Sequence, residues 1–392
     1  MGKRTPHSRK RLTAMSVDIR PVTTSTDRRR FVDLPWRLYR DDPHWVAPLR
    51  SEELKKFDPA KNPFFEHADV QLFLAYDDGR PVGRISAHVD HLHNDFHDER
   101  TGFFGFFETI RQPDVADALL KAACDWLRDQ GMTLVRGPFD FNTNGESGLL
   151  IDGFDSQPAL MMPYNPAHYA DAIERNGFAK VKDLLAYIVH LNGERFLTEM
   201  ESLVPRLEKI SQRALDDGYA TRRVNLRDFD AEVDRLREIY NEAWEANWGF
   251  VPLTEREFEA QAHELKRVVD PSLGVMIELG EEPVAFGLAL PDYNQALKPA
   301  NGRLFPFGLL KLLWHMRAID GMRAITLGIK HRHRVRGVDA LLYLHMIRAA
   351  MASRFKWCEC SWILEDNVKM RQTIERVTGE VYKTYRVYER SL

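Results

Sequence analysis

The stretch of the chain that decides the fold is residues 324–342, which read AITLGIKHRHRVRGVDALL. A mostly apolar, strand-like run passes through a cationic loop and a glycine, and an apolar helical pattern follows from Val338. A helix that begins here presents unpaired N–H groups and the positive end of its dipole, a combination that binds anions. Gly337 allows the backbone to approach a ligand closely. The stretch therefore predicts a strand, a phosphate-binding loop and a helix, although a solvated basic turn without a ligand has the same composition.

The elements around this loop form a regular series. Helical spacing predicts a helix at 231–248 and a second from Thr254, a plausible N-cap with Glu257 three residues on. Two strand-like runs and an insertion at 291–320 follow, and a further strand, a short helix and a terminal strand come after the loop and its helix. The expected bounds are 275–279 and 284–290 for the paired strands, 324–329 for the strand before the loop, about 338–353 for the helix, 356–363 for the next strand, and starts at Asp366 and Lys383 for the last two elements.

The first half of the chain repeats this series. Pro81-Val-Gly83 recurs as Pro283-Val-Ala285, and Asn165 with Gly177 recurs as Asn367 with Gly379, both at an offset of 202 residues. A self-similarity of this length indicates one ancestral domain that was doubled. The apolar spacing of residues 192–218, with Pro205 inside, predicts a kinked connecting helix between the copies.

The loop and the order of elements resemble the GNAT acyltransferase superfamily, whose cofactor motif Arg/Gln-x-x-Gly-x-Gly/Ala lies between a strand and a helix. Arg334-Val-Arg-Gly337 matches the first four positions, whereas Asp339 departs from the last and Ala340 follows it. The resemblance implies an α/β fold with an α+β mixed sheet, built as two tandem GNAT-like acyltransferase domains, with acyl-CoA as co-substrate. The residues it assigns to the cofactor are Arg332, Arg334, Val335, Arg336, Gly337, Val338, Asp339, Ala340 and Asn367.

The matching loop of the first half is degenerate. Residues 109–120 read TIRQPDVADALL, with no glycine, one arginine and two acids at the start of the helix. Acids at a helix N-terminus repel an anionic cofactor. We therefore expect acyl-CoA to bind a C-terminal GNAT domain at 219–392, and an N-terminal GNAT-like domain at 15–191 to be a structural or substrate-shaping copy.

Acyl transfer to an amine requires a base for the amine proton and a pocket that aligns the amine with the thioester. Many members of the superfamily carry a carboxylate on the strand at 324–329, and this strand has none. The candidate catalytic residues are Glu242, Tyr293, His331 and Glu146, although residues of these kinds are more often solvated or structural. Asn144 and Tyr164, with Glu146 in the long loop 139–165, are candidates to contact the acceptor, or to satisfy the loop's own backbone.

The insertion of the second half carries the main indication of substrate class. Residues 303–319 read RLFPFGLLKLLWHMRAI, and apolar residues cover most sides of the predicted helix, with Trp314 among them. A helix this apolar needs a cover, which is the domain's own core, the first half of the chain, or lipid. We include Trp314 among the substrate-binding candidates because it suits an interfacial helix or the mouth of a tunnel for an acyl chain.

The composition excludes several classes of function. The 392 residues are 44% apolar, and 55 Lys+Arg stand against 58 Asp+Glu, a balance that argues against disorder and against a nucleic-acid partner. Three cysteines are too few for a disulfide framework and indicate a reducing compartment. His88, His91, His93 and His97 crowd together without a nearby cysteine, and we expect no metal site.

The placement of the chain follows from its apolar and basic segments. No run approaches the length of a spanning helix and no signal peptide is recognisable, so we expect a cytoplasmic protein with possible peripheral contact to the inner membrane. Residues 1–14 hold five Lys and Arg without an acid. They are expected to be a disordered basic arm or an upstream start, and an electrostatic tether to an anionic membrane is the alternative.

Length, duplication and loop character are similar to those of the tandem GNAT proteins that include the bacterial ceramide synthases, which transfer a long acyl group from acyl-CoA to a sphingoid-base amine. The resemblance implies a lipid or small-molecule amine as acceptor. Three alternatives stay open: a Fem-type transferase that uses aminoacyl-tRNA, an N-acetyltransferase acting on a small molecule or a protein, and a non-catalytic CoA-binding module in which Asp339 marks a dead site. The near-neutral charge disfavours the Fem-type alternative.

Overall fold

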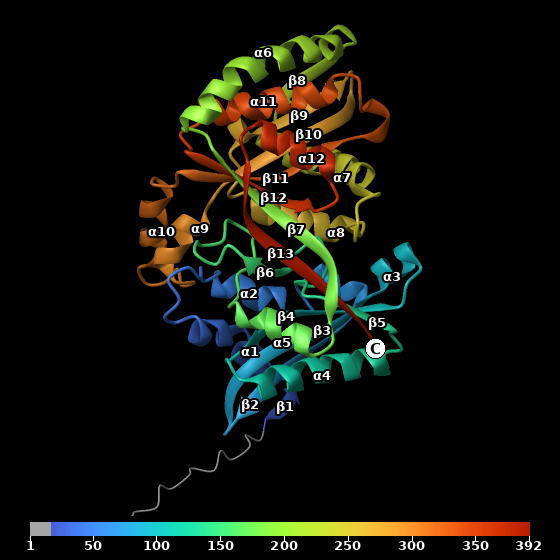
Figure 1. Cartoon of the computed structure of the whole chain (residues 1–392), viewed down its shortest axis with the longest axis vertical. Helices are drawn as coiled ribbons and strands as arrows, with labels where there is room; N and C mark the ends of the chain where they lie inside the picture. Colours follow the sequence, from blue (N-terminus) through green and yellow to red (C-terminus); the bar gives the residue numbers. More distant parts are fainter. Residues whose placement is uncertain (1–16) are drawn as a thin grey trace, which may run out of the picture.

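The computed structural model describes residues 17–392 as two mixed α/β units stacked along one long axis (Figure 1). Most of the first half lies in the lower unit in this view and most of the second half in the upper one, while the last strand, Glu380–Ser391, runs down into the lower unit. The predicted basic arm at 1–14 lies outside the described residues.

In the described part of the first half, residues 17–190, seven strands and five helices precede the connecting helix. Their order is β1 (Asp18–Pro21), α1 (Ser25–Leu38), α2 (Arg50–Lys56), β2 (Ala68–Asp77), β3 (Arg80–Asp90), α3 (His91–His97), β4 (Thr101–Thr109), α4 (Pro113–Asp129), β5 (Leu134–Gly137), β6 (Leu149–Asp152), α5 (His168–Arg175) and β7 (Ala179–His190). Helix α6 (Glu194–Asp216) follows, with Pro205 inside it.

The second half repeats the series, as its apolar spacing predicted. Its elements are β8 (Tyr219–Arg223), α7 (Phe229–Trp244), α8 (Glu255–Leu265), β9 (Gly274–Leu279), β10 (Glu282–Pro291), α9 (Asn294–Leu297), α10 (Gly308–Met316), β11 (Gly321–Ile329), α11 (Val338–Ala352), β12 (Trp357–Leu364), α12 (Val368–Arg376) and β13 (Glu380–Ser391). The predicted N-cap is confirmed, because Thr254 and Glu257 form a reciprocal capping box at the start of α8.

The strands of both halves form one continuous sheet. Its order is β1-β2-β3-β4-β5-β13-β7-β12-β11-β10-β9-β8, and β6 pairs with β13. The last strand of each half is exchanged: β13 lies between β5 and β7, and β7 pairs with β12. Figure 1 shows β7 and β13 running together through the middle of the molecule. The sheet is therefore continuous across the two predicted domains. The domain bounds 15–191 and 219–392, with a connecting helix at 192–218, stay a prediction.

Each half contains one parallel pair of strands that separates partway along its length. β4 and β5 pair only from Thr101 with Leu134 to Phe103 with Arg136. β11 and β12 pair only from Gly321 with Trp357 to Ala324 with Cys360. Beyond these registers the strands diverge, and each half has a wedge between the carboxyl ends of its parallel strands. In open α/β sheets such a crevice is where ligands bind.

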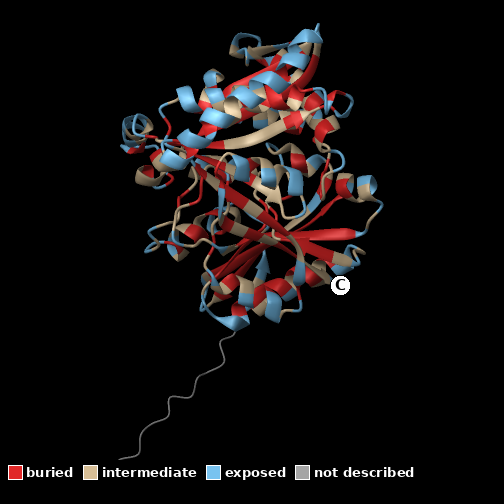
Figure 2. Cartoon of the chain, turned by 45° about the horizontal axis from the view of Figure 1, so that its top comes forward, coloured by how far each residue is buried: buried red, intermediate tan, exposed pale blue. Residues whose placement is uncertain are grey.

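Burial follows the sheet. Figure 2 shows the strands mostly buried and the outward faces of the helices exposed. Helix α4 covers the sheet of the first half through Leu119, Leu120 and Leu127, and α11 covers that of the second half through Leu341 and Leu342. Between residues 17 and 392, no helix combines the length and the apolar character needed to cross a bilayer.

Candidate active site

A cavity of about 340 Å³ opens in the wedge between β11 and β12. We name it the apolar cavity, because apolar side chains of α7, α8 and the loop after α7 make most of its wall, with Thr326 and Ser361 at the diverging strands. Its apolar lining includes Val233, Leu236, Tyr240, Trp244, Trp248, Phe250, Leu253, Phe258, Leu265, Phe286, Leu288, Ile325, Trp362 and Leu364. Thr326 Oγ1 and Trp362 Nε1 are buried there without a hydrogen-bond partner. Unpaired buried polar atoms in a cavity wall are costly unless a ligand engages them, so this wedge suits an elongated ligand with a few polar groups.

The predicted phosphate loop leads from β11 into α11. Gly337 is the N-cap residue of α11 and has φ +84°, a left-handed conformation that favours glycine. A Cβ at this position would lie 2.7 Å from the carbonyl oxygen of Ile210 on α6, which packs against α11. The glycine is therefore required by the backbone conformation and by the neighbouring helix.

Most cations of this loop are already paired. Lys330 is buried and contacts Glu238. Arg332 pairs with Glu282, and Arg334 donates to the carbonyl oxygens of Ile329 and Ala243 at 3.2 and 3.0 Å. Arg336 is exposed and forms no ion pair with any described residue. The anion-binding capacity of the loop therefore rests on the first turn of α11 and on Arg336, rather than on the whole cationic run.

The remaining cofactor candidates lie around the same helix starts. Val335 is exposed with φ +64°, and Asp339 lies in the first turn of α11 between the buried residues Val338 and Ala340. Asn367 is the N-cap of α12, and its side chain accepts a hydrogen bond from the Met370 N–H at 3.2 Å. The position of Asp339 at the dipole's positive end is locally favourable for the helix, and it competes there with an anionic ligand.

A second cavity of about 340 Å³ occupies the equivalent wedge between β4 and β5. We name it the acidic cavity, because carboxylates outnumber cations in its wall. Its charged lining is Glu52, Glu53, Lys56, Arg84, Glu108, Asp140 and Glu146, and Trp36, Trp45, Pro48, Leu160, Met161 and Tyr164 line the rest of its mouth and walls. Lys56 Nζ lies 3.0 Å from Glu53 and 3.6 Å from Asp140.

Three carboxyls of the acidic cavity, those of Glu108, Asp140 and Glu146, have raised pKa values because they are buried. Removal from solvent raises the pKa of Asp140, and the negative charges of Glu146 and Glu53 raise it further against the effect of Lys56. Burial likewise raises the pKa of Glu146. Glu108 is buried at the end of β4, where the hydroxyls of Tyr39 and Tyr169 donate to it at 2.7 and 2.8 Å. This excess of acids favours a bound cation or proton.

The two cavities meet at the loop 139–163, which we name the bridging loop. Met161 lines both cavities. Asn144 and Ser147 face the apolar cavity, and Asp140 and Glu146 face the acidic one. The Asn144 side chain ties the halves together, since it donates to the Val251 carbonyl at 3.1 Å and accepts from the Tyr240 hydroxyl at 2.6 Å. The bridging loop thus separates the two wedges.

Behind the bridging loop lies a buried polar network of the second half. Arg323 donates to Ser361 Oγ at 3.1 Å and to the Leu160 carbonyl at 2.7 Å, and Glu359 accepts from Ser361 at 2.5 Å and from Tyr382. Asp292 accepts from the Leu160 N–H at 2.8 Å, and burial followed by repulsion from Glu359 raises its pKa to about 7. These contacts hold the bridging loop against the second half.

Of the other predicted site residues, Tyr164 lines a cavity, whereas Glu242, His331, Tyr293 and Trp314 lie apart from both cavities. Glu242 accepts from the His331 N–H at 3.0 Å, so these two candidates hold the start of the loop together. Tyr293 packs beside the core of the second half, and neither it nor Glu242 or His331 lines a cavity. Tyr164 lines the acidic cavity and donates to Asp42 at 3.0 Å. Trp314 is 75% exposed on α10 and lines neither cavity.

Sequence reasoning missed Glu108, Asp140, Arg323 and Glu359. Glu108 could have been found from the sequence, because it is the acid at the end of the apolar run 102–108. This run corresponds to the strand at 324–329 of the second half, in which a catalytic carboxylate was sought. The other three could not be found in this way, because their neighbours in the fold come from distant parts of the chain.

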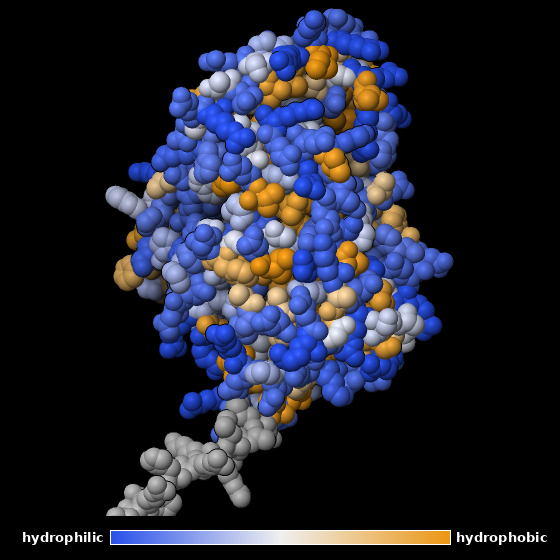
Figure 3. Space-filling model, in the orientation of Figure 1, coloured by the Kyte–Doolittle hydropathy of each residue, from blue (hydrophilic) through white to orange (hydrophobic). Residues whose placement is uncertain are grey.

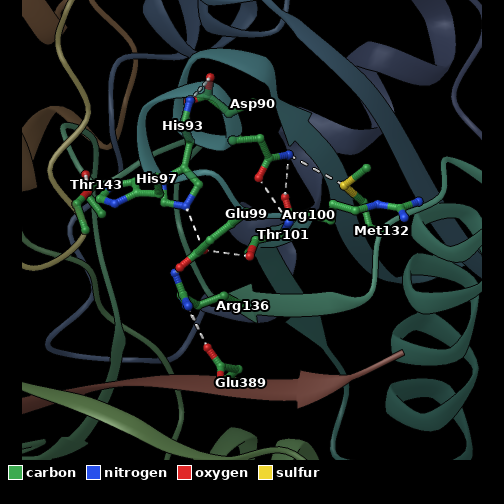
Figure 4. Close-up of polar contacts among 12 residues, drawn as sticks. Asp90, His93, His97, Glu99, Arg100, Thr101, Met132, Arg136, Thr143 and Glu389 are labelled. Carbon is green, nitrogen blue, oxygen red and sulfur yellow. Dashed lines mark hydrogen bonds and ion pairs between the residues drawn. The ribbon is translucent and has the colours of Figure 1, made fainter.

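The histidines of the first half are occupied by structural contacts. His88 is buried and donates to the Phe141 carbonyl, and burial lowers its pKa to about 4. Figure 4 shows Glu99 between His93 and Arg136, and Arg136 between Glu99 and Glu389 of the exchanged strand β13. Within residues 17–392, no group of three or more His, Cys, Asp or Glu side chains is arranged to hold a metal ion.

This architecture, two wedge-bearing units in one chain, defines the class of the protein, a tandem GNAT-fold acyltransferase. A tandem GNAT protein from the clavulanic acid biosynthesis pathway matches 96% of this chain and 98% of its own, with a TM-score of 0.55 at 12% identity. A GCN5-related N-acetyltransferase from Sphaerobacter thermophilus matches 96% of this chain and 95% of its own, with a TM-score of 0.50 at 12% identity. These structures confirm the predicted fold class.

Sequence comparison places the chain more narrowly. It is 38% identical to the bacterial ceramide synthase of Caulobacter vibrioides over 388 residues, which cover 97% of this chain and 99% of that protein. It is 38% identical to protein YghO of Escherichia coli over 384 residues, which cover 95% of each chain. No family model matches the chain. The chain therefore belongs to the family of tandem GNAT proteins that contains the bacterial ceramide synthase of C. vibrioides.

Proposed function

We propose that the protein transfers a long acyl group from acyl-CoA to the amine of a long-chain base, such as a sphingoid base, and so forms a ceramide-type amide. The observation that carries this proposal is the meeting of an apolar cavity and an acidic cavity at one loop. An acyl chain suits the first and an ammonium group the second, and Met161 lines both. The name of the C. vibrioides relative supports the same acceptor class.

Acyl-CoA fits the wedge of the second half. The free N–H groups at the start of α11 and the unpaired Arg336 would hold phosphate oxygens, and the unpartnered Thr326 Oγ1 and Trp362 Nε1 would engage polar groups of the pantetheine arm or the thioester. The apolar side chains of α7 and α8 would enclose the acyl chain. The helix start of the first half is poorer for an anion, because Pro113 lacks an N–H and Asp114 adds a negative charge.

The acidic cavity supplies the proton acceptor. An ammonium group must lose one proton to a base before its nitrogen can attack the thioester carbon. The C–S bond then breaks, and the second proton that the nitrogen loses as the amide forms goes to the thiolate of CoA. We assign the base to Glu146, because its pKa is raised by burial and because it stands on the bridging loop between the cavities. Asp140 and Glu53 share the attraction for the ammonium group, and Glu108 is held by its two tyrosines.

The test is an assay of free thiol released from palmitoyl-CoA in the presence of sphinganine, with mass spectrometry of the lipid product. We expect release of CoA together with an N-acylated base. The matched control acceptor is N-acetylsphinganine, which keeps the chain and hydroxyls but has no free amine. Absence of release with sphinganine, or equal release with the blocked acceptor, would contradict the proposal. Calorimetry with CoA identifies a non-catalytic module, which would bind CoA without turnover.

A further inference from the structure

We propose that the segment around α10 docks the protein onto an anionic lipid surface. Seven large apolar side chains of this segment are exposed, and we name them the α10 patch: Leu304, Phe305, Phe307, Leu309, Leu310, Leu313 and Trp314. Phe305 is 88% exposed and Trp314 is 75% exposed. Figure 3 shows hydrophobic side chains at the left edge of the molecule, where Figure 1 places α10. An exposed group of large apolar side chains on the surface of a globular fold marks an interaction site.

The patch does not result from a loosely attached helix. The opposite side of α10 packs on the core of the second half through Leu312 and Met316, and α10 contacts α9 and the turn Lys298–Ala300. The segment is also held by the first half, because the Trp36 indole donates to the Asn301 carbonyl at 3.3 Å. The fold therefore fixes α10 in a position that leaves its other apolar face to the outside.

The charges around the α10 patch indicate that its binding partner is an anionic lipid surface. Residues 293–319 contain no acid, and they contain Lys298, Arg303, Lys311 and Arg317. Arg303, Lys311 and Arg317 form no ion pair with a residue in the described part of the chain. A Trp and Phe-bearing apolar face bordered by Lys and Arg is the pattern of an interfacial helix, with the apolar side chains in the acyl region and the cations at anionic headgroups.

The position of the segment connects the patch with the acidic cavity. Asn294 and Leu297 of α9 line this cavity, and so do Trp36 and Pro48, the residues against which Gly302 packs. A long-chain amine that leaves the bilayer at the patch would therefore meet the mouth of the acidic cavity. This access route rests on the proposed function, whereas lipid docking by the patch does not.

The test is co-sedimentation with vesicles of phosphatidylcholine alone and of phosphatidylcholine mixed with phosphatidylglycerol in equal parts. We expect the full chain to bind the mixed vesicles at least roughly tenfold more tightly than the neutral ones, and to lose binding as salt is raised. The double variant Phe305→Ser, Leu310→Ser should lose roughly tenfold or more in affinity for the mixed vesicles. Lys311→Glu with Arg317→Glu should remove the preference for the anionic lipid.

The matched control is Leu197→Ser with Val368→Ser, which removes two exposed apolar residues from α6 and α12, away from the patch. This control should bind vesicles as the wild type does. Equal vesicle binding by the Phe305→Ser, Leu310→Ser variant and the wild type would overturn the proposal. A wild-type dimer that becomes a monomer in that variant, without vesicle binding by either, would assign the patch to a second copy of the chain and would also overturn it. Because sedimentation needs no turnover, its result is separate from that of the acyl-transfer assay.

Discussion

At the scale of single residues, the side chain of Glu146 stands out because it faces a cavity that already holds other carboxylates. No described residue donates a hydrogen bond to this side chain, and the cation nearby, Lys56, lies closest to Glu53 and Asp140. Such a group prefers a proton or a bound cation. The reaction that we propose supplies both to Glu146: the ammonium group binds first as the cation, and it then gives up its proton.

We expect Glu146→Gln to lower the turnover number for sphinganine by about two orders of magnitude or more, because general base catalysis commonly contributes that much. The loss should shrink as pH rises, since solvent then removes the ammonium proton. Initial rates of CoA release between pH 7 and pH 10 would measure both effects. The control is Glu52→Gln, which removes a carboxyl at the same cavity whose partner is the exposed Lys55. A wild-type rate in Glu146→Gln, or a pH-independent loss, would exclude Glu146 as the base.

At the scale of elements, Gly337 at the start of α11 has two roles. It lies where we propose that phosphate binds, and it allows α11 to pack closely against α6. We expect Gly337→Ala to destabilise the protein by about 2 to 3 kcal/mol, through its positive φ and the contact of the new Cβ with the Ile210 carbonyl. Gly280→Ala is the matched control, since Gly280 has φ +62° and a Cβ there would meet nothing within 4 Å. Urea unfolding curves should show a larger loss for Gly337→Ala. Equal losses of unfolding free energy in the two variants would mean that α6 moves away from the new Cβ without destabilising the protein.

The order of elements could be predicted because helical and strand periodicities are local. The exchange of β7 and β13 could not, since the alternation of either strand fits a place beside β5 or beside β12. The apolar character of α10 indicated that its apolar faces pack against something. Which of these faces stays exposed could not be predicted, because it depends on contacts of the segment with Trp36 and with the core. The cationic loop was visible in the sequence, whereas the partners that occupy it, such as Glu238 and Glu282, come from other elements.

At the scale of the whole molecule, His67 connects the two halves. Its Nδ1 lies 3.1 Å from Asp90 Oδ1, and its Nε2 lies 3.1 Å from Glu257 Oε1 on α8, an ion pair without hydrogen-bond alignment. Burial lowers the pKa of His67, but Asp90 and Glu257 outweigh it and raise the pKa to about 9. Its protonated form therefore stabilises the folded state, fully below pH 6.5 and progressively less as pH rises through 9.

We expect the wild type to lose up to about 3 kcal/mol of unfolding free energy between pH 6.5 and pH 9 through this group. The His67→Gln variant should lack this loss and should be less stable than the wild type at pH 6.5. Denaturant midpoints measured across this pH range would reveal it. His91→Gln, which changes an exposed histidine of the same half, should keep the wild-type slope. An unchanged slope in His67→Gln would show that the two carboxylates do not hold its proton.

The exchanged strands make the two halves one thermodynamic unit. Unfolding of the second half would withdraw β13 from β5 and β6, and unfolding of the first would withdraw β7 from β12, so neither wedge survives alone. We expect calorimetry to show one transition whose van't Hoff enthalpy equals its calorimetric enthalpy, although chains with two domains commonly violate this equality. Leu119→Ala in the core of the first half and Leu341→Ala in that of the second should each cost about 2 to 5 kcal/mol and lower the same transition. Two transitions, each shifted by only one of these variants, would show that the halves unfold independently and that the strand exchange adds no coupling.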